Sequence, residues 1–415
     1  MTSIIPLLQQ VQLAAPSVRR LSDLEKQNLL RDIATRLLKN ESIILTENEK
    51  DLVRMADDDP KKDRLRLTPE RIRGLAASLQ EVAALPDPSG KLISEKVLEN
   101  GLLVQKMAVP VGVVGIIYES RPNVTVDVAA LCIRSGNAIV LRGGSDATFS
   151  NKVLVGLIHE SMQGAGVDTH ALCLLPTDRK FVEELLTADR YVDIIIPRGS
   201  QALIDFVREN ATVPTIETGA GVCHTYVAAS ANLAKAAEVV VNAKVSRPSV
   251  CNALDTIVVD RTIAKTFLPM LKQRLSEWSV EIFADDESFD ILNSADYPFL
   301  LHAEESDFGR EFLDYKCSVK VVENMDEALA HIRTYSSRHS EAILSEDEAQ
   351  CERFLQEVDA AAVYANASTR FTDGGVFGLG AEIGISTQKL HARGPFALEK
   401  LVTEKWIVRG NGQVR

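Results

Sequence analysis

Residues 111–141 read VGVVGIIYESRPNVTVDVAALCIRSGNAIVL, and the fold class can be inferred from the pattern in this stretch. An apolar run at 111–118 is followed by a proline-containing turn and then by a segment of helical character that starts near Val124. A second apolar run follows at 138–141. Because two buried strands joined by a helix form a parallel βαβ unit, the stretch predicts an α/β fold with a parallel sheet.

The same alternation continues toward the C-terminus. Further apolar runs, separated by helical segments, extend the predicted open sheet at 171–174, 192–196, 224–227 and 256–259. From residue 256 to about residue 345 a second βα series follows, with strands predicted at 280–283, 318–322 and 342–344. This second series predicts another α/β domain.

Toward the N-terminus the pattern is helical. Apolar residues recur at helical spacing and predict three helices, at 23–38, 41–55 and 69–82. Residues 91–109 then alternate between apolar and polar side chains around Glu99-Asn100-Gly101, which predicts a β-hairpin. Near the other end of the chain, 366–394 is rich in glycine and polar residues, and an irregular segment of this length predicts a binding loop.

Composition restricts the possible partners. The 415 residues carry a net charge of −12, which disfavours nucleic acid and anionic membranes because phosphate binding needs clustered cations. The longest apolar stretch, 108–117, is much shorter than the roughly 20 residues that span a bilayer. Six cysteines are scattered without a CxxC pair, a pattern typical of reduced thiols rather than disulfides or a zinc site. We therefore expect a cytoplasmic protein that acts on a small molecule and holds no metal.

Cys251 is the candidate nucleophile. It lies in KVSRPSVCNA (244–253), where Arg247 and Pro248 interrupt an Ala-rich helix before a strand, so that a loop is predicted. A thiol reacts as the thiolate, and Lys244 and Arg247 would favour that form if they approach the sulfur. Small buried cysteines are common, and a packing role is the alternative.

Three turns that follow predicted strands are candidate binding features. Asn123 has two interpretations: its amide points at a developing oxyanion, or it caps the next helix. RGGSD at 142–146 and RGS at 198–200 each lie between a strand and a helix, a geometry suited to phosphate binding. Neither contains GxGxxG, and turn glycines after a strand need no ligand.

Charged residues provide further candidates. Glu217, in IETGAG (216–221), could act as a general base or bond to local amides. The segment 369–395 combines basic and acidic side chains, a mixture suited to a zwitterionic or phosphorylated metabolite: Arg370, Lys389, Arg393, Asp373 and Glu382. A solvated loop is the alternative there.

Taken together, five motifs resemble the gamma-glutamyl phosphate reductases of the aldehyde dehydrogenase superfamily. They are PVGVVGIIYESRPNVT (110–125), IETGAGVCH (216–224), RPSVCNA (247–253), YANASTRFTDGG (364–375) and FGLGAEIGISTQKLHARGP (377–395). The resemblance covers nearly the whole chain and implies an aldehyde dehydrogenase-like fold of three parts. These are a Rossmann-like NADPH-binding domain (1–89 and 110–228), an α/β catalytic domain (229–393), and a small β oligomerisation unit made of the hairpin (90–109) and a C-terminal strand (394–415).

In that family NADPH reduces L-glutamyl 5-phosphate to L-glutamate 5-semialdehyde with release of phosphate, the second step of proline biosynthesis from glutamate. The resemblance implies the same reaction for this chain, and it implies a homo-oligomer. Association with glutamate 5-kinase, which makes the labile substrate, is left open.

Carried over residue by residue, the resemblance assigns roles within the motifs. Cys251 is the nucleophile that displaces phosphate to give a thioester, and Asn123 forms the oxyanion hole with the Cys251 backbone N–H. Contacts to NADPH are implied for Arg142, Ser145, Pro197, Gly199, Ser200 and, loosely, Glu311. Asp146 argues against a cofactor phosphate beside Ser145.

Substrate binding is a hypothesis from charge complementarity for Lys244, Arg247, Arg370 and Arg393. Glu217 aligns with the base that activates water in hydrolytic aldehyde dehydrogenases. Because hydrolysis would waste the activated substrate, we assign Glu217 a structural or substrate-positioning role.

Two other functions are compatible with parts of this pattern. The first is an NAD(P)-dependent aldehyde dehydrogenase that oxidises an aldehyde and hydrolyses the thioester. The second is a catalytically silent oligomer that binds a metabolite or a partner. The presence of Cys251 together with Asn123 is evidence against the second, because a silent protein needs neither a nucleophile nor an oxyanion donor.

Overall fold

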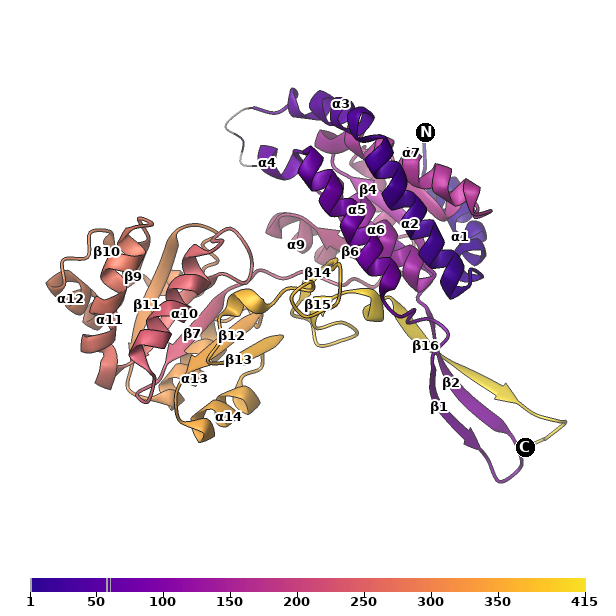
Figure 1. Cartoon of the computed structure of the whole chain (residues 1–415). Coiled ribbons are helices and arrows are strands. Elements are labelled where there is room, and N and C mark those ends of the chain that lie inside the picture. The colour runs from indigo at the N-terminus through magenta and orange to yellow at the C-terminus, as the bar shows by residue number, and fades with distance from the viewer. Residues whose placement is uncertain (1, 57–58, 60) are drawn as a thin grey trace. The chain divides into compact units, whose positions relative to one another are not determined.

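The computed structural model describes residues 2–56, 59 and 61–415, and the chain forms two compact units (Figure 1). The first unit comprises Met1–Thr218, Gly378–Gly384 and Pro395–Arg415, and the second comprises Gly219–Phe377 and Ile385–Gly394. Each unit contains a parallel sheet of its own. The predicted α/β class is confirmed.

A four-stranded parallel sheet lies in the first unit, in the order β5-β4-β3-β6. Its strands are β3 (Val113–Tyr118), β4 (Ala138–Gly143), β5 (Leu172–Leu174) and β6 (Ile194–Arg198). All residues of β3 are buried, as expected of an apolar central strand in a parallel sheet. The helices that accompany these strands are α6 (Pro122–Ser135), α7 (Thr148–Gly164), α8 (Lys180–Leu186) and α9 (Gln201–Asn210). The βαβ unit predicted from 111–141 is confirmed.

The N-terminal part of this unit is helical. Its helices are α1 (Ile5–Arg19), α2 (Asp23–Lys39), α3 (Glu41–Leu52), α4 (Lys61–Leu65) and α5 (Pro69–Ala84). Ser22 and Glu25 form a capping box at the start of α2, and Thr68 caps α5. The three predicted helices are confirmed, although the one predicted to reach residue 55 ends at Leu52. Helix α1 was not predicted on its own, because Pro16 lies inside it and proline is unusual within a helix.

The predicted hairpin is β1 (Leu92–Val97) and β2 (Leu103–Pro110), which pair in an antiparallel manner. Gly101 in the connecting turn has a φ of +85°, a conformation that glycine adopts readily. The C-terminal strand β16 (Val402–Arg409) adds to β2 and completes a three-stranded sheet, β1-β2-β16, that extends from the rest of the first unit (Figure 1). Both strand predictions are confirmed.

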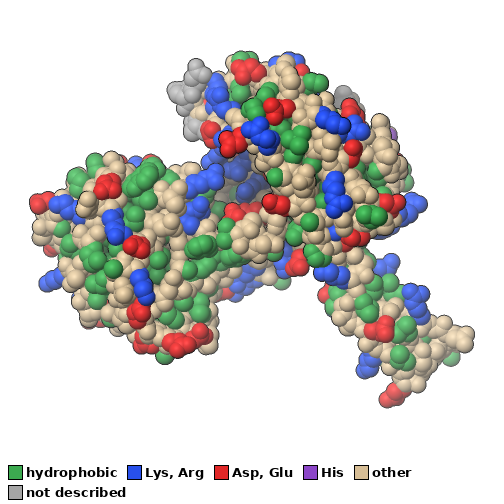
Figure 2. All heavy atoms as spheres, in the orientation of Figure 1, with side chains coloured by type: hydrophobic (Ala, Val, Ile, Leu, Met, Phe, Trp, Pro, Cys, Tyr) green, Lys and Arg blue, Asp and Glu red, His purple; other side chains and the backbone are tan. Residues whose placement is uncertain are grey.

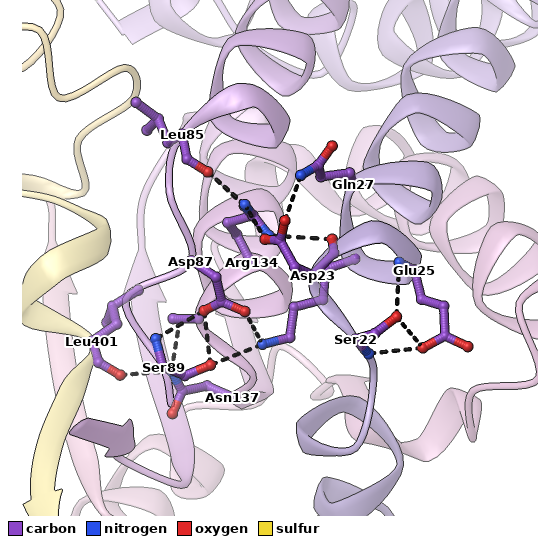
Figure 3. A network of polar contacts seen from close by, with 12 residues as sticks. Ser22, Asp23, Glu25, Gln27, Leu85, Asp87, Ser89, Arg134, Asn137 and Leu401 are labelled. Atoms are coloured by element: carbon purple, nitrogen blue, oxygen red, sulfur yellow. Dashed lines mark hydrogen bonds and ion pairs between the residues drawn. The ribbon is translucent and has the colours of Figure 1, made fainter. Parts of the chain in front are cut away.

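A polar network fixes the base of this three-stranded sheet to the helices (Figure 3). Arg134 of α6 is buried, and its guanidinium donates to the carbonyl oxygen of Leu85 and pairs with Asp23 at 2.6 Å. Lys26 of α2, also buried, pairs with Asp87 at 2.6 Å. The side-chain amide of Asn137 donates to the Leu401 carbonyl oxygen at 2.8 Å. The chain is therefore held by hydrogen bonds both before β1 and before β16.

The second unit contains a seven-stranded parallel sheet in the order β10-β9-β11-β8-β7-β12-β13. The strands are β7 (Cys223–Val227), β8 (Leu254–Asp260), β9 (Glu281–Ala284), β10 (Leu300–His302), β11 (Lys316–Val322), β12 (Ser340–Leu344) and β13 (Ala362–Ala365). Its helices are α10 (Leu233–Val245), α11 (Arg261–Ser276), α12 (Asp286–Ser294), α13 (Met325–Tyr335) and α14 (Glu348–Glu357). The second α/β series predicted from the sequence is confirmed.

Two runs that were expected to extend the first sheet lie in the second one. The run at 256–259 is in β8, where the second predicted series was expected to begin. The run at 224–227 is β7, which pairs with β8 and β12 in the second unit. The chain passes into that unit at Gly219, before the boundary expected at residue 228. Composition does not reveal to which sheet β7 belongs, because β7 is fully buried, as β3 of the first sheet is.

The segment 366–394 is largely irregular, as predicted, and contains the short helix η4 (Thr369–Phe371) and strand β14 (Gly384–Ser386). Strand β15 (Gly394–Phe396) follows, and neither strand was predicted. The remaining short helices are η1 (Ser145–Ala147), η2 (Thr169–Ala171), η3 (Glu305–Asp307) and η5 (Leu398–Lys400). Within the described part of the chain, no helix has the length and apolar character needed to cross a membrane.

Candidate active site

Cys251 lies on the loop between α10 and β8, as predicted. Helix α10 ends at Val245, and Pro248 follows shortly after, where a proline disfavours continuation of the helix. The Cys251 side chain is half-buried, and the chain then enters the sheet at Leu254. The candidate nucleophile therefore lies near the amino-terminal ends of the parallel strands of the second sheet.

The strand register brings other segments to the same edge. Cys223 of β7 pairs with Leu254, and Ser340 of β12 pairs with Ala362 of β13. Because β7, β8, β12 and β13 are parallel neighbours, the residues that precede each of them lie along one edge. The site is assembled from these pre-strand segments.

Asn252 connects the Cys251 loop to the segment 369–372. Its side-chain amide donates to the carbonyl oxygens of Arg370 at 3.2 Å and Thr372 at 2.8 Å. In return, the hydroxyl of Thr369 donates to the Asn252 carbonyl oxygen at 2.8 Å. The first part of the predicted binding loop is thus attached directly to the nucleophile loop.

Arg370 places a guanidinium at this loop. Its Nε donates to the hydroxyl oxygen of Ser246 at 3.2 Å, and its Nη1 donates to Asn252 Oδ1. Burial lowers the pKa of Arg370, the charge of Arg247 lowers it further, and Cys251 acts in the opposite direction. The charges of Arg370, Arg247 and Cys251 therefore act on one another, and two guanidinium groups at this loop suit an anionic substrate.

Lys244 does not take the position that was predicted for it. The side chain is fully buried, and its Nζ donates to the carbonyl oxygens of Asp314 at 3.1 Å and Lys316 at 2.7 Å. The same ammonium lies 3.6 Å from Asp255, a buried carboxyl group whose pKa is raised to about 7 by burial, while Lys244 opposes that shift. We therefore correct the substrate-binding assignment of Lys244 to a structural one.

Glu311 also belongs to the second unit, where its Oε1 accepts a hydrogen bond from the Gly221 N–H at 2.8 Å. Burial raises the pKa of Glu311, and the Gly221 hydrogen bond opposes this shift. The carboxylate thus has a backbone partner next to the nucleophile loop, whereas the cofactor ribose was the partner expected.

Arg393 pairs with Asp359, just before β13, at 2.8 Å. Lys389 pairs with the same carboxylate at 2.7 Å, and the two cations hold the pKa of Asp359 below its usual value. Arg393 keeps its Nε and Nη2 buried without a protein hydrogen-bond partner among the described residues. Its guanidinium is therefore only partly engaged by Asp359.

Asn123 lies in the first unit, in the first turn of α6. The N-cap of α6 is Arg121, so the alternative in which Asn123 caps the helix is wrong. Its side-chain Nδ2 donates to Asp127 Oδ2 at 3.1 Å, one helical turn later. Burial raises the pKa of Asp127 to about 6, and the hydrogen bond from Asn123 opposes the shift.

Arg142 lies in β4, and its Nη2 donates to the Thr177 carbonyl oxygen at 2.8 Å. Burial lowers the pKa of Arg142, and Asp146 opposes this shift. Beyond the carboxyl ends of β4 and β5 there is a cavity of about 330 Å³, lined in part by Gly143, Asn151 and Thr177. Ser145 is exposed in the adjacent short helix. The position and volume of the cavity suit part of a nicotinamide dinucleotide. The buried Nε of Arg142 has no hydrogen-bond partner among the described residues, which suits it to donate to such a ligand.

The second predicted cofactor turn follows β6. Pro197 lies in the strand and is buried, Gly199 follows it, and Ser200 caps α9 through its hydroxyl. The backbone N–H of Ser200 donates to Glu119 Oε2 at 3.0 Å. A carboxylate of the protein thus already accepts one of the amide hydrogens that were expected to bind a phosphate.

Glu217 lies at the end of the first unit, 3.8 Å from Arg208. Burial raises the pKa of Glu217, and the charge of Arg208 opposes the shift. The ion pair agrees with a structural contribution of this carboxylate.

Several residues of the site escaped the sequence reasoning. Asp127, which holds the Asn123 amide, could have been found from the i,i+4 spacing on a helix. Gly221 and Cys223, which contact the Cys251 backbone, had no signal except their place in a glycine-rich turn before a strand.

Comparisons with known proteins identify the family of the chain. The model of the aldehyde dehydrogenase family matches residues 8–291, about two thirds of the chain. A glyceraldehyde-3-phosphate dehydrogenase from Methanocaldococcus jannaschii, complexed with NADP, shares the fold at 17% identity, with a TM-score of 0.71 over 98% of this chain and 94% of that one. The protein is a member of the aldehyde dehydrogenase family.

More similar proteins narrow this assignment. The gamma-glutamyl phosphate reductase of Chlorobaculum parvum is 52% identical over 414 residues, which cover 100% of this chain and 98% of that one. The crystal structure of gamma-glutamyl phosphate reductase from Thermotoga maritima has a TM-score of 0.95 and 43% identity, with full coverage of both chains. Within the family, the chain belongs to the gamma-glutamyl phosphate reductases.

Proposed function

We propose that the protein reduces L-glutamyl 5-phosphate to L-glutamate 5-semialdehyde with NADPH and releases phosphate, as the second step of proline biosynthesis from glutamate. The observation that carries this proposal is the half-buried Cys251 on a loop beside Arg247 and Arg370, in a chain that matches gamma-glutamyl phosphate reductases over its full length. An acyl phosphate is an anion with a good leaving group, which suits a thiolate next to two guanidinium groups.

The Cys251 thiolate attacks the acyl carbon of the substrate. A carbon–sulfur bond forms, the bond from carbon to the phosphate oxygen breaks, and phosphate leaves with the electron pair of that bond. The product is a thioester on Cys251. NADPH held by the first unit would provide a hydride for reduction of the thioester to the aldehyde, and Cys251 would then leave as the thiolate.

We assign the oxyanion hole to Asn123 and the Cys251 backbone N–H. Asp127 takes one hydrogen of the Asn123 amide, which orients the NH₂ group and leaves its second hydrogen for the oxyanion. Asn123 belongs to the first unit and Cys251 to the second, so this pairing stays a prediction.

NADPH is assigned to the first unit, with Arg142, Ser145, Pro197, Gly199 and Ser200 as its contacts. Arg142 would be the cation for the additional phosphate of NADPH. Its Nε lacks a protein partner among the described residues, and its Nη2 donates to Thr177, which lines the cavity at β4 and β5. Glu119 would have to release the Ser200 amide before a phosphate could bind there.

For the substrate, Arg247 and Arg370 are assigned to the anionic groups near the acyl carbon, and Arg393 to a second anionic group. Glu217 keeps its structural or substrate-positioning assignment. Lys244 is withdrawn from the substrate contacts because its ammonium is buried and bonded to carbonyl oxygens.

We also infer a homo-oligomer built through the three-stranded sheet. On the face seen in Figure 2, this sheet carries apolar side chains between charged ones. Four apolar side chains of this sheet are more than half exposed: Leu92, Val97, Trp406 and Val408. A cytoplasmic location and association with glutamate 5-kinase stay predictions.

The reverse reaction tests the proposal. With glutamate 5-semialdehyde, NADP⁺ and the purified protein, NADPH should appear only when phosphate or arsenate is added, because the thioester needs an oxyanion as acceptor. An NAD(P)-dependent aldehyde dehydrogenase that hydrolyses its thioester would form NADPH without phosphate, and this result would contradict the proposal.

A further inference from the structure

We propose that Cys223 is a positioning residue for the nucleophile, and that residues 221–224 are the support on which the Cys251 loop is held. This inference rests on the proposed function only in taking Cys251 as the reacting thiol. It concerns a second cysteine, which does not itself touch substrate or cofactor.

The support lies in direct backbone contact with the nucleophile. A Cβ atom added to Gly221 would lie 2.6 Å from the Cys251 Cα and would overlap the Cys251 carbonyl group. This neighbour is backbone rather than a flexible side chain, so the overlap could be relieved only by moving the loop. Glycine is therefore required at 221 for the loop to take its observed position.

The Cys223 thiol provides the second contact. Its Sγ lies 3.2 Å from the Cys251 carbonyl oxygen, within hydrogen-bond distance for a sulfur donor. Cys223 is completely buried, and burial raises the pKa of its thiol well above the ordinary value. The sulfur thus keeps its proton, so that it donates to the carbonyl and does not compete as a nucleophile.

Three acceptor side chains fix the support itself. The backbone N–H groups of residues 221, 222 and 224 donate to Glu311 Oε1, Ser337 Oγ and Glu341 Oε2, each at 2.8 Å. The acceptors come from three different segments: the chain before β11, the chain before β12, and β12 itself. A segment held by separate parts of the unit is a rigid base for the loop that rests on it.

The consequence for Cys251 is restricted rotation of its backbone. Its carbonyl oxygen accepts from Cys223, and the next carbonyl oxygen, that of Asn252, accepts from Thr369. Two successive peptide groups after the reactive residue are therefore held by side-chain donors. Fixed peptide planes on the C-terminal side of Cys251 restrict rotation about its Cα–C bond and so hold its side chain in one orientation, which favours attack on a bound acyl group.

Two substitutions separate the hydrogen bond from simple packing. Cys223→Ala removes the donor, whereas Cys223→Ser keeps a hydroxyl donor at nearly the same place. The matched control is Cys317→Ala, which alters an equally buried cysteine of β11 in the same unit. For each variant, kcat and KM are measured in the phosphate-dependent reverse reaction, together with the rate at which iodoacetamide alkylates Cys251 and the thermal unfolding midpoint.

We expect Cys223→Ala to lower kcat and the alkylation rate of Cys251 by about tenfold with KM nearly unchanged, and Cys223→Ser to restore most of both. Cys317→Ala should lower the unfolding midpoint but leave both rates near wild type. Wild-type rates in Cys223→Ala would overturn the proposal, as would equal losses in the Ser and Ala variants. Alkylation of Cys251 needs no substrate. The alkylation rates therefore still test the role of Cys223 if the protein does not catalyse the proposed reaction.

The support can also be tested without changing Cys223. Glu311→Gln keeps an oxygen acceptor for the Gly221 N–H, and Glu311→Ala removes it. We expect the alanine variant to lose about tenfold in kcat with the KM for NADP⁺ unchanged, and the glutamine variant to recover most of that loss. A higher KM for NADP⁺ with unchanged kcat in both variants would place Glu311 on the cofactor ribose and would remove it from the support.

Discussion

The hydrogen bond between the Asn123 amide and the Asp127 carboxyl group makes the proposed oxyanion donor sensitive to pH. Burial raises the pKa of Asp127 from its ordinary 3.8 to about 6. The group is therefore ionised, and is a strong acceptor for the Asn123 amide, only above about pH 6. At lower pH the protonated carboxyl group holds the amide more weakly.

This raised pKa predicts a specific pH dependence of stability. Because the folded protein binds the Asp127 proton more tightly than the unfolded chain, the contribution of Asp127 to stability is complete below about pH 4 and is lost as the pH rises through about 6. The difference in urea midpoint between wild type and Asp127→Asn should therefore shift in favour of the variant between pH 4.5 and pH 7.5. An unchanged difference across this range would show that the Asp127 pKa is not raised.

At the same scale, the sequence allowed correct placement of Cys251 on a loop but not of Lys244. A helix end followed by Arg247 and Pro248 predicts a loop from local chemistry alone. Burial of the Lys244 ammonium depends on two carbonyl oxygens some 70 residues later, which no local pattern specifies. Hydrogen bonds between distant segments, such as the one from Cys223 to the Cys251 carbonyl oxygen, could not be predicted for the same reason.

Among the elements, the three-stranded sheet depends on charged side chains buried at its base (Figure 3). Arg134→Met would remove the donors to the Leu85 carbonyl oxygen and leave that acceptor unsatisfied. We expect a loss of about 2 kcal/mol in the free energy of unfolding, the usual cost of an orphaned buried polar group. The control is Arg36→Met. The ion pairs of Arg36 with Asp32 and Glu160 are partly exposed to solvent and should contribute at most about 1 kcal/mol. Equal losses in chemical denaturation would contradict this account of the anchor.

Strands with a continuous apolar run were predictable, including the three-residue β5, whereas β10, β13, β14 and β15 were not predicted. β3, β4 and β8 each contain a run that reads as a buried strand from composition. β10 and β14 have three residues each, so their strand character depends on the neighbours with which they pair. The extent of α3 was overestimated for a similar reason, since helix ends are set by local caps that periodicity does not show.

For the whole molecule, the exposed face of the three-stranded sheet predicts self-association. Trp406 and Val408 are two residues apart on β16, so their side chains point to the same face, and both are more than half exposed. Replacing both by Glu should lower the molar mass measured by light scattering toward that of a single 45.5 kDa chain. Leu13→Glu, at a still more exposed leucine of α1, is the control and should leave the mass unchanged. A double variant with the wild-type mass would exclude this face as the interface.

Two parallel α/β sheets were predictable from alternating strands and helices, but the division of the chain was not. The hairpin and β16, expected to form a third part, belong to the first unit, and the second unit begins at Gly219 rather than after residue 228. Both sheets are parallel and built from similar apolar runs, so β7 carries no mark of the sheet to which it belongs. Only the pairing of β7 with β8 and β12 decides that question.

The central claim is that one sulfur atom carries the acyl group. The most direct measurement compares wild type with Cys251→Ser in the phosphate-dependent reverse reaction, alongside NADP⁺ binding followed by the change in protein fluorescence. A serine hydroxyl is a far weaker nucleophile than a thiolate, so turnover should fall by a factor of about 1000 or more while NADP⁺ affinity stays near wild type. Turnover at the wild-type rate in the serine variant would contradict the account.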